Sequence, residues 1–188
     1  MRFTLHYSGP LYANGRPDHK HEIRRVLHAQ LAELWKHEPL SGLTGYQRPK
    51  DDPTRKTWEV VSSVRSRGAF TFVPLATTEL KLIADLEVLL LRPEPPGRLV
   101  TQGGDIDNRM KTLLDALSLP QADGLPKGAT PAADETPFYV VLEDDNLITS
   151  LTVKTEHLLK PNDSNHVELL LRFHVTSTSP TWGNNAFK

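Results

Sequence analysis

The sequence predicts a single α/β (α+β) domain in which one mixed β-sheet packs against two main helices. Two segments, 20–37 and 107–117, carry apolar residues at helical spacing. Short apolar or alternating runs typical of strands surround them, at 1–7, 80–91, 138–142, 147–155 and 167–175. With 188 residues, 38% of them hydrophobic, the chain can bury one sizeable core but not two.

Each predicted helix has an apolar side that a sheet can cover. The first carries Ile23, Val26, Leu27, Leu31, Leu34 and Trp35 on one side. The second carries a stripe of Met110, Leu113, Leu114 and Leu117. We therefore expect both helices to pack on the sheet through these residues.

The domain is expected to span 1–176, with loop insertions near 38–57 and 118–137 and a loosely ordered tail over 177–188. The 118–137 segment is rich in Pro and Gly, which indicates a loop that is mobile or ordered only by tertiary contacts. In the tail, only Trp182 or Phe187 is expected to dock on the domain.

A hairpin is expected within 57–73, where alternation is imperfect. Its turn would lie at Arg65-Ser66-Arg67-Gly68.

Composition excludes several classes of protein. The chain has no cysteine, which excludes a disulfide framework, a thiolate metal site and a cysteine nucleophile. No stretch approaches the roughly 20 apolar residues of a membrane span, and the N-terminus lacks a signal-peptide pattern, so we expect a cytoplasmic protein without a membrane partner.

The most informative segment is Asp105-Ile106-Asp107-Asn108-Arg109-Met110-Lys111, which opens the second predicted helix. Carboxylates this close together repel each other unless a cation compensates them or their pKa values rise. A hard cation such as Mg²⁺ accepts oxygen ligands and is usually held by one or two carboxylates, several waters and a substrate phosphate.

The helix would also prepare this site for a phosphate. Asp107, Lys111 and Asp115 follow one another at i, i+4 and i+8, so they share one helix face. The N-terminus of a helix favours anions. Asp105 and Asp107 could therefore hold a metal ion while Lys111 and free backbone N–H groups receive a phosphate.

A simpler interpretation remains open for both acidic segments. Asp is a preferred N-cap, and an Asp–Lys pair at i, i+4 is common on helix surfaces. The downstream Asp144-Asp145-Asn146 could be turn residues between two strands. Neither motif is specific alone.

Together, the two motifs resemble the RusA family of Holliday junction resolvases, which carries D-x-D-N-x-x-K-x-x-x-D-A-L at the start of a helix and then an acidic pair before a strand. This chain matches each defining position from Asp105 to Leu117, and its pair is Asp144-Asp145. The resemblance implies a homodimer that resolves four-way DNA junctions in recombination and repair, with Mg²⁺, or Mn²⁺ in its place, as cofactor. It also implies Asp105, Asp107 and Asp145 as metal-binding catalytic carboxylates and Lys111 as the base or phosphate contact.

Two features depart from that family. The 118–137 segment is longer than the family's usual connection. In addition, family members are often basic, whereas this chain has 22 Lys and Arg residues and 23 Asp and Glu residues, a net charge of −1. DNA binding needs local basic surface. The competing hypothesis is a non-catalytic DNA-binding or scaffold protein that retains the resolvase fold.

Local basic groups nevertheless exist. The residues expected to contact DNA are Arg16, Lys20, Arg24 and Arg109. A second basic group, Lys50, Arg55 and Lys56, lies in the 38–57 loop, although charge runs are more often solvated faces than binding sites.

Overall fold

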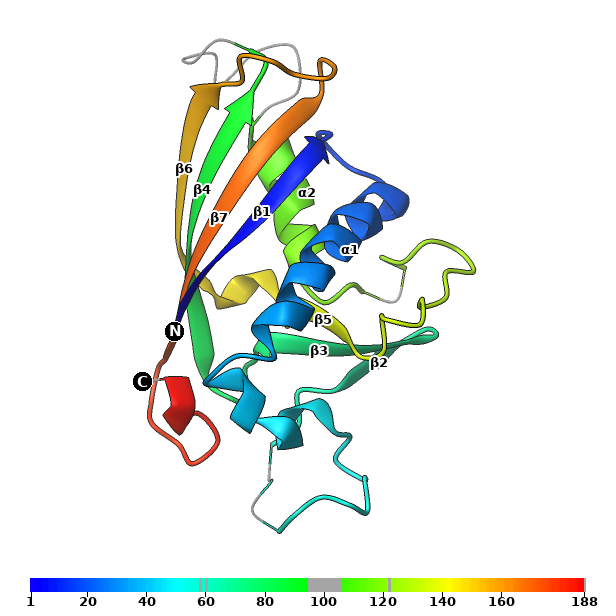
Figure 1. The fold of residues 1–188 in the computed structure, drawn as a ribbon, viewed down its shortest axis with the longest axis vertical. Helices are drawn as coiled ribbons and strands as arrows, with labels where there is room; N and C mark the ends of the chain where they lie inside the picture. The colour runs from blue at the N-terminus through cyan, green and yellow to red at the C-terminus, as the bar shows by residue number, and fades with distance from the viewer. Residues whose placement is uncertain (58, 60, 95–105, 122, 188) are drawn as a thin grey trace.

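Two β-sheets and two α-helices form the chain in the computed structural model (Figure 1), which describes residues 1–57, 59, 61–94, 106–121 and 123–187. The larger sheet has the strand order β1-β7-β4-β6. Its strands are β1 (Arg2–Pro10), β4 (Leu82–Arg92), β6 (Ile148–His157) and β7 (His166–Ser177). Only the β4–β6 pair is parallel; β7 pairs antiparallel with both β1 and β4.

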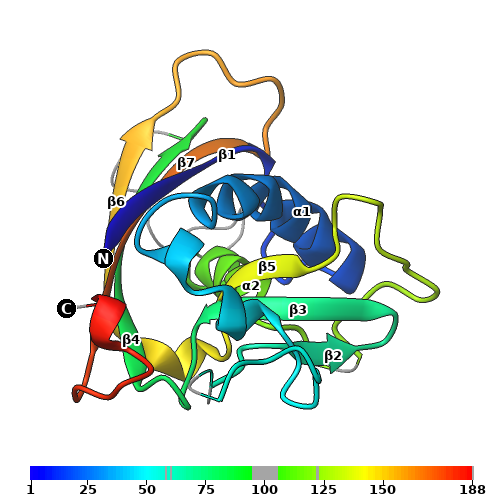
Figure 2. The same ribbon diagram turned by 60° about the horizontal axis from the view of Figure 1, so that its bottom comes forward.

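The smaller sheet has the order β2-β3-β5 and forms the other side of the molecule. Its strands are β2 (Arg65–Arg67), β3 (Phe70–Ala76) and β5 (Phe138–Leu142), and β3 and β5 run parallel. The helices α1 (Pro17–Leu34) and α2 (Ile106–Leu117) lie between the two sheets (Figure 2). The predicted mixed α/β fold is confirmed, but the expected single sheet is two sheets.

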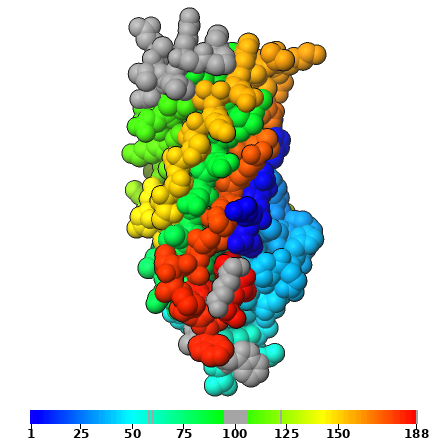
Figure 3. Space-filling model, turned by 90° about the vertical axis from the view of Figure 1, so that its left-hand side faces the viewer, coloured from blue at the N-terminus to red at the C-terminus, as the bar shows by residue number. Residues whose placement is uncertain are grey.

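The larger sheet buries only one of its faces against the helices. Inward-facing residues alternate along β4, and Leu86, Val88 and Leu90 are almost completely buried. On the opposite face, β6, β4, β7 and β1 lie side by side at the surface (Figure 3). This face is therefore free to carry polar side chains.

One polar group on that outer face is centred on Glu168 of β7. Ser8 donates a hydrogen bond to Glu168 Oε1 at 2.6 Å, and the Nε2 atoms of His6 and His166 lie 2.7 and 3.3 Å from its two oxygens. Partial burial alone would raise the pKa of Glu168, but the hydrogen bonds outweigh it and hold the pKa below the ordinary 4.5.

Helix α1 begins three residues earlier and ends three residues earlier than the predicted 20–37. Pro17 occupies the first helical turn, where its missing N–H costs nothing, and Arg16 is the N-cap. On the buried side, Ile23, Leu27 and Leu31 enter the main core. Helix α1 also covers the edge of β1, because the Gln30 amide exchanges two hydrogen bonds with the His6 backbone, at 2.7 and 2.9 Å.

The 118–137 loop is ordered by tertiary contacts. Leu119 is buried in a second, smaller core with Phe70, Phe72, Phe138 and Val140. Arg25 of α1 forms an ion pair with the buried Glu135 at 2.7 Å. His28 of α1 accepts a hydrogen bond from the Tyr139 backbone through Nδ1, so its Nε2 donates to the Asp134 carbonyl at 3.2 Å. Of the two alternatives for this loop, the structure shows the ordered one.

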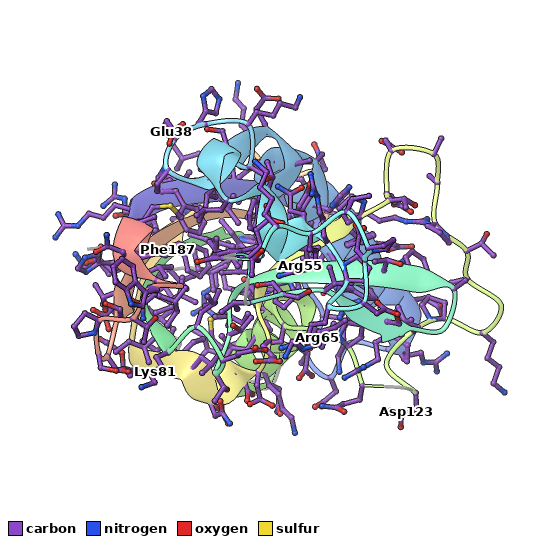
Figure 4. The ribbon with its side chains drawn as sticks, turned by 90° about the horizontal axis from the view of Figure 1, so that it is seen from below. Glu38, Arg55, Arg65, Lys81, Asp123 and Phe187 are labelled. Carbon is purple, nitrogen blue, oxygen red and sulfur yellow. The ribbon has the colours of Figure 1, made fainter. Side chains whose placement is uncertain are left out.

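The 38–57 loop and the tail are also more structured than expected. The first contains two short 3-10 helices, η1 (Leu40–Gly42) and η2 (Thr44–Gln47). In the tail, the Asn184 amide donates to the carbonyls of Leu80 and Ser179, both at 2.8 Å. Phe187, in η4 (Asn185–Phe187), is buried in the main core (Figure 4), whereas Trp182 is fully exposed. Of the two aromatic side chains expected to dock, Phe187 packs in the core and Trp182 does not, and the Asn184 amide adds a contact that the sequence did not indicate.

Within the described ranges, no helix is both long and apolar enough to cross a membrane.

Candidate functional site

The downstream acidic pair lies beside the C-terminal half of α2. Ser118, directly after α2, forms a parallel bridge with Leu142, the last residue of β5, and the Leu119 N–H donates to the Leu142 carbonyl at 2.8 Å. The chain then enters the short 3-10 helix η3 (Asp145–Leu147). This bridge places the downstream acidic pair beside the C-terminal half of α2, and η3 lies near the lower end of α2 in Figure 1.

The chain is anchored immediately before the acidic pair. The Glu143 carboxylate accepts a hydrogen bond from Arg65 Nε at 2.8 Å and another from the Thr78 backbone N–H at 3.0 Å. These contacts connect Glu143 to β2, through Arg65, and to the segment after β3, through Thr78. The direction of the following residues is therefore determined by the fold.

Asp144 and Asp145 have different roles. The Asp144 side chain accepts a hydrogen bond from the Asn146 N–H at 3.0 Å and caps η3, a local contact that agrees with the interpretation of this segment as turn residues. Asp145 is the first residue of η3 and is exposed as a whole residue. Partial desolvation of its carboxyl group nevertheless raises the pKa of Asp145, and the negative charges of Asp144 and Asp115 raise it further.

Asp115, in the last turn of α2, joins α2 to α1. Lys20 Nζ lies 2.7 Å from its Oδ2, and Arg24 Nη2 donates to its backbone carbonyl at 2.9 Å. Arg24 is only 2% exposed, and burial lowers its pKa to about 10. Lys20 and Arg24 were predicted to contact DNA from the surface. The structure corrects this for Arg24, which lies inside the molecule and binds the end of α2.

A cavity of about 260 Å³ opens between these elements. Its walls come from α1, the C-terminal end of α2, the turn that follows α2, and the start of η3. The side chains that matter for its chemistry are Lys20, Arg24, Asp115, Ser118, Asp144 and Asp145.

The first acidic motif lies at the other end of α2. Asp105 is outside the described residues. Asp107 is exposed in the first turn, and Lys111, one turn later, is exposed and forms no ion pair within the described part of the chain. Asp107 and Asp115 are two turns apart, about 12 Å along the helix axis. Asp145 lies beside the Asp115 end, so the structure brings Asp145 together with Asp115, and both with the face that also carries Lys111.

Carboxylate oxygens suit a hard cation, so the donor set at α2 fits Mg²⁺. No three His, Cys, Asp or Glu side chains in the described ranges are already arranged to share one metal ion. The described residues would therefore supply one or two carboxylates to a cation bound there, with water among the other ligands, which is the usual arrangement for Mg²⁺.

The remaining two residues predicted to contact DNA differ from each other. Arg16 is exposed at the N-cap of α1. The Arg109 side chain is only 3% exposed and pairs with Glu94 at 3.2 Å, so it too is not a surface contact. Sequence reasoning named Asp115 as part of a helix face and as a position of the motif, but not as a metal ligand. Nothing in the sequence indicated Ser118.

Comparisons of the chain with protein-family models, with curated proteins and with solved structures find no match.

Proposed function

We propose that the protein is a Mg²⁺-dependent endonuclease that cuts branched DNA, with four-way junctions as the expected substrate. The observation that supports this most strongly is that two acidic motifs, about 40 residues apart in the sequence, lie beside the two ends of one helix, α2. The first motif resembles the RusA pattern at each defining position. A structural cap and a surface ion pair would not require the second motif to lie there.

In this proposal Asp105, Asp107 and Asp145 are the candidate cation ligands. Because Asp107 and Asp145 lie beside opposite ends of α2, one cation would be held by Asp107 or by Asp145 and not by both. When bound, a divalent cation lowers the pKa of a coordinated water and neutralises charge on the phosphate. Lys111 would contact the scissile phosphate or orient the attacking water, and the N-terminus of α2 would supply backbone N–H groups for a second phosphate oxygen.

A homodimer is part of the proposal, because symmetric cutting of a four-way junction takes two active sites. Light scattering at micromolar concentration, with and without junction DNA, tests it. A monomer mass under both conditions would exclude the dimer.

The test of the activity is cleavage of a panel of branched DNAs, including junctions, flaps and forks, in Mg²⁺ and in Mn²⁺. Asp107→Asn, Asp145→Asn and Lys111→Ala are each expected to abolish cutting while the first two retain junction binding. Asp51→Asn, at an exposed position in the 38–57 loop, removes the same charge as the two Asn variants and should leave cutting unchanged. Full activity of Asp107→Asn or Asp145→Asn would contradict the assignment of these carboxylates.

One observation weakens the case for the nuclease and so bears on the second candidate, a non-catalytic DNA-binding or scaffold protein. Of the four residues predicted to contact DNA, Arg24 and Arg109 are buried and Lys20 is paired with Asp115. Junction binding without cleavage in either metal, across the whole panel, would support this candidate instead.

A further inference from the structure

The cavity at the C-terminal end of α2 carries excess negative charge. Four aspartates line it, Asp115, Asp123, Asp144 and Asp145, against the two cations Lys20 and Arg24. Asp123 lies on the loop after α2 (Figure 4). The negative end of the α2 dipole points to the same place, and the last turn of α2 contains no basic residue. A cation is therefore the charge type that this cavity favours.

Unused polar atoms in the cavity wall point to a ligand independently of the charge count. Ser118 is only 7% exposed, and its Oγ has no hydrogen-bond partner in the part of the chain that the structure describes. The Nε of Arg24 is likewise buried without a partner there. Buried hydroxyls and guanidinium groups are normally hydrogen-bonded to protein or to ordered water. A hydrated ligand can supply such water, since a volume of 260 Å³ has room for an ion and several waters at about 30 Å³ each.

Lys20 already brings one positive charge to Asp115. Its Nζ is 2.7 Å from Asp115 Oδ2, and its side chain remains 25% exposed. A lysine ammonium is a compact, strongly hydrated point charge on a flexible stem, so it can leave a carboxylate more readily than a bidentate arginine. The adjacent Asp145 has no such counter-ion among the described residues, and it lies within electrostatic reach of Asp115 and Asp144.

We propose that this cavity is a binding site for a hydrated divalent cation, Mg²⁺ or Mn²⁺, held by Asp115 and Asp145, and that Lys20 takes the place of the cation on Asp115 when none is bound. Two carboxylates are enough, because Mg²⁺ usually retains several waters. The inference deepens the proposed function, on which its catalytic significance rests, by adding Asp115 as a ligand and Lys20 as a competing internal cation. On cation binding, the released Lys20 ammonium would face solvent at the cavity rim, where it could contact a phosphate.

The test is Mn²⁺ binding to the whole 188-residue chain without DNA, measured by electron paramagnetic resonance of free Mn²⁺ and by calorimetry. Asp115→Asn should weaken binding about tenfold, because one of two carboxylate charges is lost. Lys20→Gln should tighten binding several-fold, because the competing cation is removed. Lys154→Gln removes the same charge from the exposed outer part of β6 and should leave the affinity unchanged.

A purely structural Lys20–Asp115 ion pair gives a different result. In that case Lys20→Gln would leave Mn²⁺ affinity unchanged or lower it, and this outcome would overturn the proposal. If a Lys20 variant fails to fold, the site can be tested in the wild-type protein by the broadening of backbone amide NMR signals on addition of Mn²⁺. Amides near Ser118 and Asp145 should broaden first, whereas broadening that begins at Asp107 and spares Ser118 would refute the site.

The binding test and the cleavage test can fail separately. Tight Mn²⁺ binding that depends on Asp115 and Lys20, without cleavage of any branched DNA, would support the cation site and reject the nuclease. Cleavage that survives Asp115→Asn, with unchanged Mn²⁺ affinity, would support the nuclease and reject this site.

Discussion

Replacement of Arg55 tests whether a basic loop residue serves the fold or DNA. Its guanidinium lies inside the 38–61 region (Figure 4) and donates to the backbone carbonyls of Gly45 at 2.8 Å, Arg48 at 2.7 Å and Val61 at 2.9 Å. It also donates twice to the carbonyl of Glu59. These four carbonyls come from both ends of the loop, so Arg55 joins η2 to the segment that leads into β2.

Arg55→Gln should therefore destabilise the protein substantially. Each lost hydrogen bond costs about 0.5–1.5 kcal/mol, and since the carbonyls are only part-buried, water will replace some of them. We expect the free energy of unfolding to fall by about 2–3 kcal/mol, which corresponds to a Tm decrease of roughly 5–10 °C for a chain of this length. Urea and thermal unfolding, followed by circular dichroism, measure both quantities.

Arg67→Gln is the matched control for Arg55. Arg67 lies at the β2–β3 hairpin and donates one hydrogen bond, to the carbonyl of its neighbour Ser66. Its replacement should change stability by less than about 0.5 kcal/mol. The reasoning would be refuted if Arg55→Gln unfolded like the wild type but bound junction DNA more weakly, because Arg55 would then be a DNA contact, as its basic neighbours in the sequence suggested.

Three further predictions follow from burial and charge. Leu119→Ala should lower the free energy of unfolding by about 2–4 kcal/mol, whereas Leu159→Ala, at an 84% exposed position, should change it little; equal effects in urea unfolding would show that the 118–137 loop is not part of the core. At pH 7 Asp145→Asn should raise the Tm, because the raised pKa of Asp145 means that its charged form destabilises the folded state. The Tm difference between the variant and the wild type should vanish as pH falls below the ordinary pKa of 3.8. A lower Tm for the variant at pH 7 would contradict this. The depressed pKa of Glu168 means that its ionised form stabilises the fold above about pH 4.5 and that this contribution is lost as pH falls further. Between about pH 4.5 and 2.5 the wild type should therefore lose more stability than Glu168→Gln. Parallel profiles of stability against pH for the two proteins would exclude the effect.

Local patterns predicted the elements whose period is unambiguous. β5 spans the expected 138–142. α2 begins one residue before the expected 107 and ends at the expected Leu117, which is the last residue of its apolar stripe. α1 was displaced because the polar segment before residue 20 shows no apolar periodicity, although Pro17 is well suited to a helix start. Residues 58 and 60 of the expected 57–73 hairpin lie outside the described residues. A hairpin is found between β2 and β3, but its turn lies at Gly68 and Ala69, because Arg65, Ser66 and Arg67, which were expected in the turn, form β2.

Long-range pairing could not be predicted in this way. The separation into two sheets depends on the parallel pairing of Phe72 with Phe138, and no periodicity within either strand specifies that partner. The arrangement of the site could not be predicted from the sequence for the same reason. The Ser118–Leu142 bridge brings Asp145 to Asp115, and the exchange of hydrogen bonds that orders this region is visible only in three dimensions.

Two of the basic side chains predicted to contact DNA, Arg24 and Arg109, are buried, so this nearly neutral chain needs another source of positive charge to bind DNA. A basic residue at i+4 from another, as Arg24 is from Lys20, looks like surface charge in a sequence, yet Arg24 binds the α2 carbonyl that only the folded chain presents. Of the residues predicted to contact phosphate, Arg16 and Lys111 are exposed, so counterion release by side chains alone would contribute little affinity. A divalent cation at Asp115 and Asp145 would add two positive charges and would release Lys20 as a third. It follows from the proposed site that Mg²⁺ should strengthen junction binding itself, and not only the cutting step.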